Sequence, residues 1–431
     1  MFNKLALSGE RLSSVLAGPW SMKLFYLGYF SAMGIYLPYL GLYLGAVGLS
    51  GTQIGLTASM FPLAGVVMPP IWGLLSDRYS WRKQLLIVTL LGAVITSLLL
   101  WLIAHSFLVL LLCIIVLAIS LSPVIPLADA ITLQWIGQRG GSYGTVRVYG
   151  SIGFLVAAIA AGSFLNEVGI TALFLLLAVV FCGPFLASFF VPTQSKVSMT
   201  HVKRRELVVL LHDRTLLLFL LLCMVGYGTF AAYNTFFGLY LRGLGVSTRA
   251  IGLASGMASL SELPTMMLSG IMMKRLGVKW LLLIGLSVAV VRWLAYAIFT
   301  DYSVLFAFTL LHGISFASFY TAAVTFIDRY VPIHLRTTGQ TLFYGTSFGL
   351  GTWASTNLFG TLYERLHGSG IFLVAAALCA ASLLGLLLLI PRNPAPVSSE
   401  ISQRSRTCAR EKATALPQEY EPKEEKVEGS H

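Results

Sequence analysis

Charged side chains are scarce in this 431-residue sequence, in which Asp, Glu, Lys and Arg make up 11% of the residues and hydrophobic residues 57%. A soluble domain carries about 25% charged residues, so this chain lacks the polar surface that would cover a water-exposed fold. Its longer apolar runs, such as 85–104 and 371–390, reach the roughly 20 residues needed to cross a bilayer. Because lipid offers backbone polar groups no partner, these runs are expected to be helices. The sequence therefore predicts an all-α membrane protein.

Several kinds of chemistry are missing as well. Four of the five cysteines lie inside apolar runs and no pair has metal-ligand spacing, which argues against a disulfide framework and a metal site. No phosphate-binding glycine loop is present, which disfavours an ATP-driven pump. The intramembrane charges form no nucleophile–base pair, so we expect no enzyme and no cofactor. The cysteines are Cys113, Cys182, Cys223, Cys379 and Cys408.

The net charge of +12 is explained by where the basic residues lie. With the N-terminus inside, basic residues crowd the inner segments, whereas the outer loops hold only Arg242, Arg249 and Arg365. The positive-inside rule then predicts a multi-pass protein of the cell (inner) membrane with both termini in the cytoplasm. The charge reflects topology, and a nucleic-acid partner has no support. Twelve membrane helices are predicted, at 22–44, 54–75, 84–104, 107–133, 146–166, 170–191, 215–241, 250–273, 280–299, 303–328, 338–363 and 370–390.

An internal repeat divides the chain into two halves. Residues 41–59 (GLYLGAVGLSGTQIGLTAS) match residues 238–256 (GLYLRGLGVSTRAIGLASG) at a constant shift of 197. Further along, Gly73 and Arg78 recur as Gly270 and Arg275 without a gap. A same-orientation repeat of six helices is typical of transporters with two parallel halves around a central site.

This repeat gives a domain organisation. We predict an N-terminal cytoplasmic segment at 1–21, six-helix bundles at 22–191 and 215–390, a basic cytoplasmic linker at 192–214 and a tail at 391–431. The tail is rich in Ser, Pro, Glu, Lys and Arg and is expected to be disordered. The first apolar run is too long for a cleaved signal peptide.

A charged loop separates the second and third predicted helices, where residues 73–83 read GLLSDRYSWRK. Asp77 with Arg78, Arg82 and Lys83 can form a cluster that locks an inner gate. A solvated, positively charged turn is the alternative. The second copy, GIMMKRLGVK, has Lys274 where the acid would stand, which weakens the case for a second gate.

Ionisable residues inside membrane helices are costly and usually functional. Each half offers one acid and one arginine, which predicts an Asp129–Arg147 pair and a Glu262–Arg292 cluster with His312. Static ion pairs that pin the helices together are the alternative. The favoured interpretation is a substrate site whose acid exchanges a proton when the pair separates.

Other polar and aromatic residues of these helices are harder to assign. Asn234 could bind a polar group of a substrate or a neighbouring helix. Aromatic residues are frequent along 22–44 and 215–241, and most of them are attributed to packing and to interfacial belts.

Local motifs now point to a family. Residues 34–44 read GIYLPYLGLYL, residues 126–130 read PLADA, and residues 143–155 read YGTVRVYGSIGFL. With the loop pattern G-x-L-x-D-R-x-x-x-R-K that starts at Gly73, the chain over 22–390 resembles major facilitator transporters of the lactose permease-like group. It is most similar to their phenylpropionate permease-like (MFS_1_like) branch. The resemblance implies the major facilitator fold, with two pseudo-symmetric bundles of six helices.

The resemblance also assigns roles. Asp129 falls where lactose permease has its sugar-binding glutamate, Arg147 matches an arginine of that site, and Phe154 replaces a tryptophan that stacks on the sugar. Arg292 and His312 match the proton-coupling cluster, and Glu262 lies about one turn from its acid.

One position departs from that family. Ser315 occupies the place of the principal proton-carrying glutamate. Any coupling proton must then reside elsewhere, and Glu262 or Asp129 is the natural candidate.

These features predict a monomeric secondary transporter that imports a small organic solute by proton symport. The solute is a sugar or nucleoside-like compound, or an aromatic carboxylic acid, because the site offers both an acid–arginine combination and an aromatic ring. Proton-coupled efflux on the same fold is the alternative, although Gly150–Gly153 lacks the proline- and glycine-rich pattern of many efflux carriers. A non-transporting membrane sensor is a third possibility, which the absence of an output domain disfavours.

Overall fold

The computed structural model describes residues 19–79, 81–103, 106–140, 142–192 and 210–390. These residues form helices joined by short loops, and no strand occurs among them. The prediction of an all-α protein is confirmed. Residues 1–18, 193–209 and 391–431 lie outside the described part, and with them most of the predicted N-terminal segment, most of the linker and the tail.

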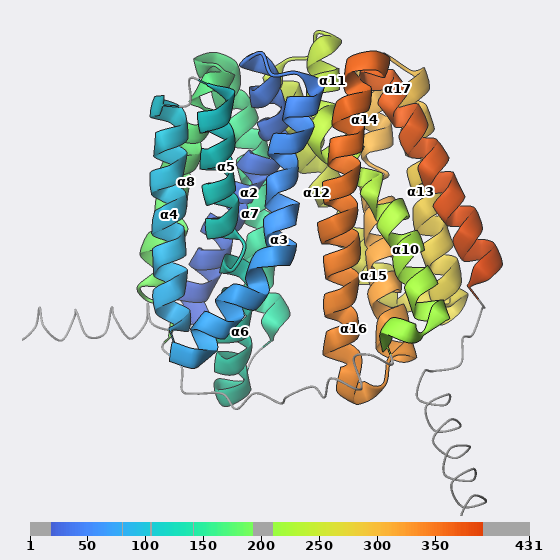
Figure 1. The fold of residues 1–431 in the computed structure, drawn as a ribbon, viewed down its shortest axis with the longest axis horizontal. Coiled ribbons are helices and arrows are strands. Elements are labelled where there is room, and N and C mark those ends of the chain that lie inside the picture. Colours follow the sequence, from blue (N-terminus) through green and yellow to red (C-terminus); the bar gives the residue numbers. More distant parts are fainter. Residues whose placement is uncertain (1–18, 80, 104–105, 141, 193–209, 391–431) are drawn as a thin grey trace, which may run out of the picture.

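The helices form two bundles that stand side by side in Figure 1. The first contains α2 (Pro19–Ala46), α3 (Gly51–Tyr79), α4 (Arg82–Ile103), α5 (Phe107–Leu121), α6 (Val124–Arg139), α7 (Tyr143–Val168) and α8 (Leu173–Ser188). The second contains α10 (Arg214–Gly228), the π-helical η2 (Ala232–Phe236), α11 (Phe237–Gly243), α12 (Thr248–Leu276), α13 (Val278–Ile298), α14 (Tyr302–Thr309), α15 (His312–Tyr330), α16 (Arg336–Phe343), the π-helical η4 (Tyr344–Gly351) and α17 (Thr352–Leu389).

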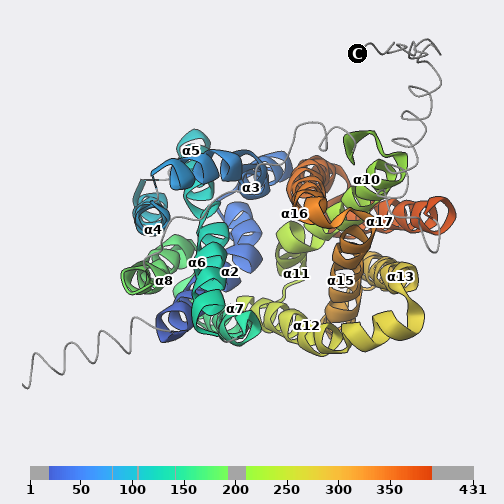
Figure 2. The same cartoon turned by 90° about the horizontal axis from the view of Figure 1, so that it is seen from below.

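Nine segments of the described chain are long and apolar enough to cross a bilayer. One of them, Arg336–Leu388, passes through His367, whose backbone angles (φ 57°, ψ −168°) are not helical, so the helix breaks there. Neither α2 nor α12 is among the nine, although they have 28 and 29 residues. Both helices face the other bundle (Figure 2). Their sequences contain many tyrosine, serine and glycine residues in place of the apolar side chains of a lipid-facing helix. The number of twelve membrane helices stays a prediction.

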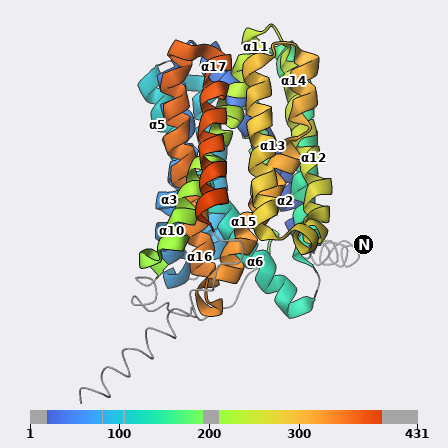
Figure 3. The same ribbon diagram turned by 90° about the vertical axis from the view of Figure 1, so that its right-hand side faces the viewer.

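The two ends of the molecule differ. Figure 3 shows α6 and α16 at one end and α11 and α14 at the other. Pro192 and Leu210, between which the chain passes from the first bundle to the second, lie at the end of α8 and just before α10. We call this side the linker end, and the side with the loops at 47–50 and 244–247 the opposite end.

Several helices predicted as continuous are broken. The segment 107–133 is divided at Ser122 and Pro123, because proline removes a backbone donor and crowds the preceding turn. The segment 215–241 contains the π-helical η2, and the segment 303–328 is divided at Leu310 and Leu311. π-helical turns often occur at functional sites. Each break lies within a few residues of a candidate site residue: Asp129, Asn234 or His312.

Glycines bring the bundles together at the opposite end. Gly252 of α12 lies so close to α7 that a Cβ there would stand 2.7 Å from the Ala158 carbonyl oxygen and 3.0 Å from Gly162 Cα. A Cβ on Gly360 of α17 would stand 2.8 Å from Gly55 Cα of α3. Small residues allow helix backbones to approach closely where lipid gives no hydrophobic driving force.

Hydrogen bonds between the bundles lie at the same end. The Thr52 backbone N–H donates to Glu364 Oε1 at 2.8 Å, and Asn357 Nδ2 donates to Ser59 Oγ at 2.9 Å. These contacts and the glycine contacts close the opposite end.

Replacing Gly252 with valine is expected to open this end. A branched Cβ cannot fit between α12 and α7, so conformations with separated bundles should become more populated. The reporter is Ser255→Cys, which lies in the wall between the bundles, in a background without the native cysteines. With Gly252→Val added, labelling of this cysteine by an impermeant maleimide from the opposite end should rise several-fold. The matched control is Gly270→Val on the same helix, where a Cβ meets no atom within 4 Å. An equal rise in the control would contradict this role of Gly252.

Candidate functional site

A cavity of about 280 Å³ lies between the two bundles. The first bundle contributes α2 and α7 to its wall, and the second contributes α10, η2, α11, α12 and α15. Aromatic rings dominate the lining, and one arginine, one glutamate and one histidine face it. The principal lining residues are Phe30, Arg147, Phe154, Tyr227, Phe230, Tyr233, Asn234, Phe237, Glu262, His312 and Phe316.

Arg147 supplies the positive charge of the first wall. Its guanidinium carbon lies 3.8 Å from the centre of the Phe30 ring and 5.8 Å from that of Tyr26. Gly150, one turn along α7, leaves the room this requires, because a Cβ there would stand 2.7 Å from Arg147 Nη1 and from the Phe30 ring. No described side chain forms an ion pair with Arg147. The cation is thus held in place by rings and is open to an anion in the cavity.

Asp129 does not pair with Arg147, and the predicted pair in the first bundle is wrong. Its carboxylate accepts hydrogen bonds from the hydroxyls of Tyr26 (2.5 Å) and Tyr143 (2.9 Å). The break at Pro123 places Asp129 in the first turns of α6, and it is not among the residues that line the cavity. The carboxylate that was expected to pair with an arginine is thus hydrogen-bonded to two tyrosine hydroxyls.

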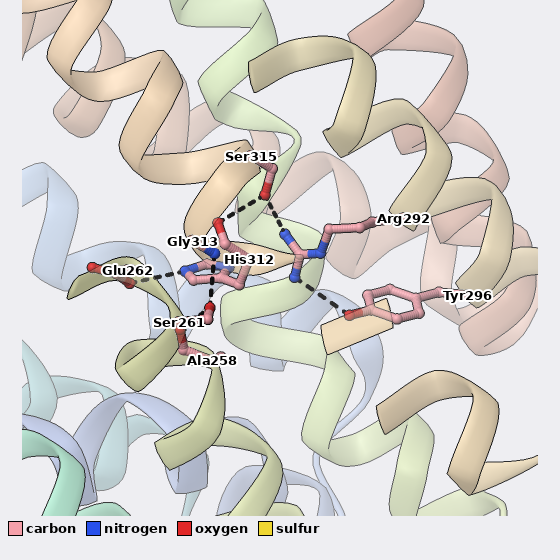
Figure 4. Close-up of polar contacts among 8 residues, drawn as sticks. All are labelled: Ala258, Ser261, Glu262, Arg292, Tyr296, His312, Gly313 and Ser315. Carbon is pink, nitrogen blue, oxygen red and sulfur yellow. Dashed lines mark hydrogen bonds and ion pairs between the residues drawn. The ribbon is translucent and has the colours of Figure 1, made fainter. Parts of the chain in front are cut away.

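Glu262 and His312 form the ionisable pair of the second wall. His312 Nε2 lies 3.1 Å from Glu262 Oε1, so α12 and α15 are joined across the cavity wall (Figure 4). The imidazole is stacked between Tyr233 and Phe316, with ring centroids 5.3 and 5.6 Å away. His312 Nδ1 has no hydrogen-bond partner among the described residues. Stacking fixes the plane of the imidazole ring beside Glu262.

Arg292 stands behind this pair and is fully buried. Its guanidinium donates to Ser315 Oγ at 2.8 Å and to the Tyr296 hydroxyl at 3.3 Å (Figure 4). The rings of Tyr233 and Trp293 lie 5.0 and 4.9 Å from its carbon. Of the predicted cluster of Glu262, Arg292 and His312, the Glu262–His312 contact is present, whereas an ion pair between Glu262 and Arg292 is not. Arg292 contacts hydroxyls and rings, and no described carboxylate forms an ion pair with it.

A close backbone approach holds this arrangement together. The Gly313 N–H donates to Ser261 Oγ at 2.8 Å, and a Cβ on Gly313 would overlap the backbone of Ser261. Since Ser261 precedes Glu262 and Gly313 follows His312, this contact sets the distance between the two ionisable groups.

Replacing Gly313 with alanine should therefore destabilise the protein by about 1–3 kcal/mol, the usual cost of overpacking. The midpoint of thermal unfolding in detergent measures this effect. Gly270→Ala on α12, where a Cβ meets no atom within 4 Å, is the control. Equal midpoints in the two variants would show that the backbones at Gly313 and Ser261 are not in close contact.

Phe154 and Asn234 both line the cavity, as a substrate-binding role requires. Asn234 belongs to the π-helical η2 and is exposed there. Asn357 instead bonds to Ser59 across the bundles. The roles of Phe154 and Asn234 in binding stay predictions.

The charged segment 73–83 covers the end of α3 and the start of α4 at the linker end. Gly73 has no atom within 4 Å of where a Cβ would be, and the Arg78 guanidinium lies 5.6 Å from the Tyr79 ring. Lys83 Nζ donates to the Phe189 carbonyl oxygen, 2.7 Å away at the end of α8. Arg82 begins α4, and the side chain of Asp77 lies outside the described part. The gate formed by these five residues stays a prediction.

Several contributors were not predicted from the sequence, among them Phe30, Tyr26 and Tyr143. Phe30 and Tyr26 are four residues apart and therefore share one face of α2, which was a usable signal. Tyr143 gave none, because its contact with Asp129 depends on the turn between α6 and α7.

Comparisons with known proteins agree with this architecture. The chain matches the family model described as MFS_1 like family over residues 19–375. It is 28% identical to the maltose permease of Geobacillus stearothermophilus over 335 residues, which cover 78% of this chain and 85% of that protein. It is 26% identical to the probable 3-phenylpropionic acid transporter of Escherichia coli (strain K12) over 258 residues, or 59% and 67% of the two chains.

A solved structure shares the fold. The crystal structure of the nucleoside transporter NupG superposes with a TM-score of 0.78 at 17% sequence identity, covering 86% of this chain and 98% of that chain. At this identity the likeness shows the fold alone.

Proposed function

The chain belongs to the MFS_1 like family of membrane transporters, and from this premise we propose that it imports a small organic solute together with a proton. The observation that carries the proposal is the cavity between the bundles, with an unpaired arginine on one wall and a glutamate–histidine pair on the other. One wall offers a charge to a substrate, and the other offers a group that can carry a proton.

Alternating access fits the way the bundles touch. The contacts of Gly252 and Gly360 close the opposite end, and the linker end carries the basic loops. We infer from the positive-inside rule that the linker end is cytoplasmic, and that the conformation with the bundles in contact at the opposite end is the inward-facing one. Rocking of the bundles about the cavity would then expose it to the outside. This proposal includes a location in the cell (inner) membrane and both termini in the cytoplasm. It also includes action as a monomer.

The lining of the cavity favours one substrate class. Stacked rings provide flat apolar faces, and Arg147 provides a cation whose planar guanidinium can bind a carboxylate through two hydrogen bonds. Asp129, the acid expected to bind sugar hydroxyls, is occupied by two tyrosines away from the cavity wall. An aromatic carboxylic acid therefore fits better than a sugar or a nucleoside. Among the relatives, the one named as a 3-phenylpropionic acid transporter agrees with this class, and the maltose permease does not.

Glu262 is the best candidate to carry the proton. It lines the cavity beside His312, whereas the position of the family's acid holds Ser315, which bonds to Arg292. Protonation of Glu262 would weaken its attraction to His312 and loosen α12 from α15. Substrate at Arg147 and proton at Glu262 are thus coupled across one cavity.

Uptake into proteoliposomes tests the proposal. Radiolabelled 3-phenylpropionate, maltose and uridine are offered with and without an imposed inward proton gradient. We expect accumulation of the aromatic acid that depends on the gradient and stops when a protonophore collapses it. Accumulation of maltose or uridine alone would reject the substrate class, and accumulation that ignores the gradient would reject proton symport.

A further inference from the structure

A second cavity, of about 490 Å³, lies in the second bundle at the linker end, far along α12 from the central site. It is lined by the end of α12, the start of α13 and the ends of α15 and α17. Among the described residues, its lining includes four cations and no acidic residue. The cations are Lys274, Arg275, Lys279 and Arg329.

The positive charge of this cavity is not neutralised by the described residues nearby. Lys274, Arg275 and Arg329 form no ion pair with any of them. The nearby acid Asp328 pairs with Arg336 at 3.4 Å, and Asp213 accepts from the hydroxyl of Tyr330 at 2.9 Å.

Lys279 has a structural role in the wall of the cavity. Its Nζ donates to the carbonyl oxygens of Leu387 (2.7 Å) and Ile390 (2.5 Å) at the end of α17. This leaves three cations available to a ligand.

The start of α13 adds to this charge. Gly277 precedes the helix with φ 84°, and no side chain caps the first turn. The first N–H groups of a helix have no partner within the helix, and they favour anions. Val278, Lys279 and Trp280 of this turn line the same cavity as the cations.

The cavity also has an apolar side. Leu276 and Trp280 line it and are 41% and 45% exposed, while Leu282 and Phe326 form a buried part of its wall. Figure 2 places α13 and α17 at the outer edge of the second bundle, away from the first. A ligand here can contact cations and apolar side chains at the same time.

We propose that this cavity binds the phosphate-bearing headgroup of an anionic phospholipid. Lys274, Arg275 and Arg329 would bind the phosphate of the headgroup. The acyl chains of the lipid would lie along the apolar surface of α13. The outward position and the apolar rim favour a lipid over a soluble phosphate compound. Basic pockets between membrane helices are known to take such headgroups.

Native mass spectrometry of the full chain, purified in detergent and stripped of lipid, tests this assignment. Phosphatidylglycerol and phosphatidylcholine with identical acyl chains are the probes, and inorganic phosphate is the competitor. We expect wild type to retain phosphatidylglycerol and to bind phosphatidylcholine much more weakly. The double variant Lys274→Gln with Arg275→Gln should bind phosphatidylglycerol about tenfold less tightly or worse, since each surface cation contributes to attraction of anionic lipid.

Two controls make the result specific. The double variant Lys23→Gln with Arg214→Gln removes the same charge at the same end and should bind like wild type. Lys274→Arg with Arg275→Lys keeps both charges and should also bind. Equal losses in the two glutamine variants, or equal binding of the two lipids by wild type, would overturn the proposal. Displacement of the lipid by an equal concentration of inorganic phosphate would assign the cavity to a soluble anion instead.

Discussion

Replacing Arg147 with alanine is expected to lower substrate affinity by about 2–4 kcal/mol, or roughly 30- to 1,000-fold in Kd. Arg147 is the cation of the first cavity wall, stacked 3.8 Å from Phe30 and without an ion-pair partner among the described side chains. A carboxylate in the cavity would lose its counter-charge and the two parallel hydrogen bonds of the guanidinium. Binding of the aromatic acid to the purified protein, measured by calorimetry, gives the affinity directly.

Two further variants separate binding from structure. Arg147→Lys keeps the charge but loses the planar stacking and the paired donors, so an intermediate affinity is expected. Arg249→Ala removes an arginine at the opposite end, outside the cavity, and should bind like wild type. If Arg147→Ala binds every transported solute as tightly as wild type does, Arg147 has a packing role against Phe30 and the proposed site is wrong.

Replacing Glu262 with glutamine is expected to abolish uphill transport while leaving exchange of substrate across the membrane. Glutamine keeps an oxygen that can accept from His312 Nε2 but cannot take up a proton. The bundles should still alternate, so labelled substrate should enter vesicles preloaded with unlabelled substrate. With a proton gradient and empty vesicles, the internal concentration should not exceed the external one.

The control for this variant is Asp328→Asn. Asp328 pairs with Arg336 at 3.4 Å near the linker end, where an exposed ion pair is worth at most about 1 kcal/mol. Its loss should leave gradient-driven accumulation unchanged. Uphill accumulation by Glu262→Gln at the wild-type level would show that the proton is carried elsewhere.

The repeat at 41–59 and 238–256 belongs to the scaffold, and the ionisable residues do not follow it. At the same shift of 197, Asp129 and Arg147 correspond to Phe326 and Tyr344. Gly55 and Gly252, which correspond to each other at that shift, both lie at contacts between the bundles. The two halves thus share the residues that bring them together and differ in the residues that face the cavity.

The amino-acid sequence was sufficient to predict the all-α membrane class, because continuous apolar runs of about 20 residues satisfy their backbone groups in lipid as helices. It also identified ionisable residues that line the cavity, since placing an ionisable side chain in a membrane helix costs free energy and is usually functional. Arg147, Glu262 and His312 all face the cavity, together with Phe154 and Asn234.

How these charged residues pair depends on the tertiary structure. Sequence reasoning paired Asp129 with Arg147 and grouped Glu262 with Arg292 and His312, whereas Asp129 bonds to two tyrosines and Glu262 pairs with His312 and not with Arg292. The reason is that pairing depends on distances of a few ångströms, which are set by the helix breaks before Asp129 and His312 and by the close approach of Gly313 to Ser261. Hydropathy records which segments enter the membrane, but it carries no information on how far each helix is turned about its axis.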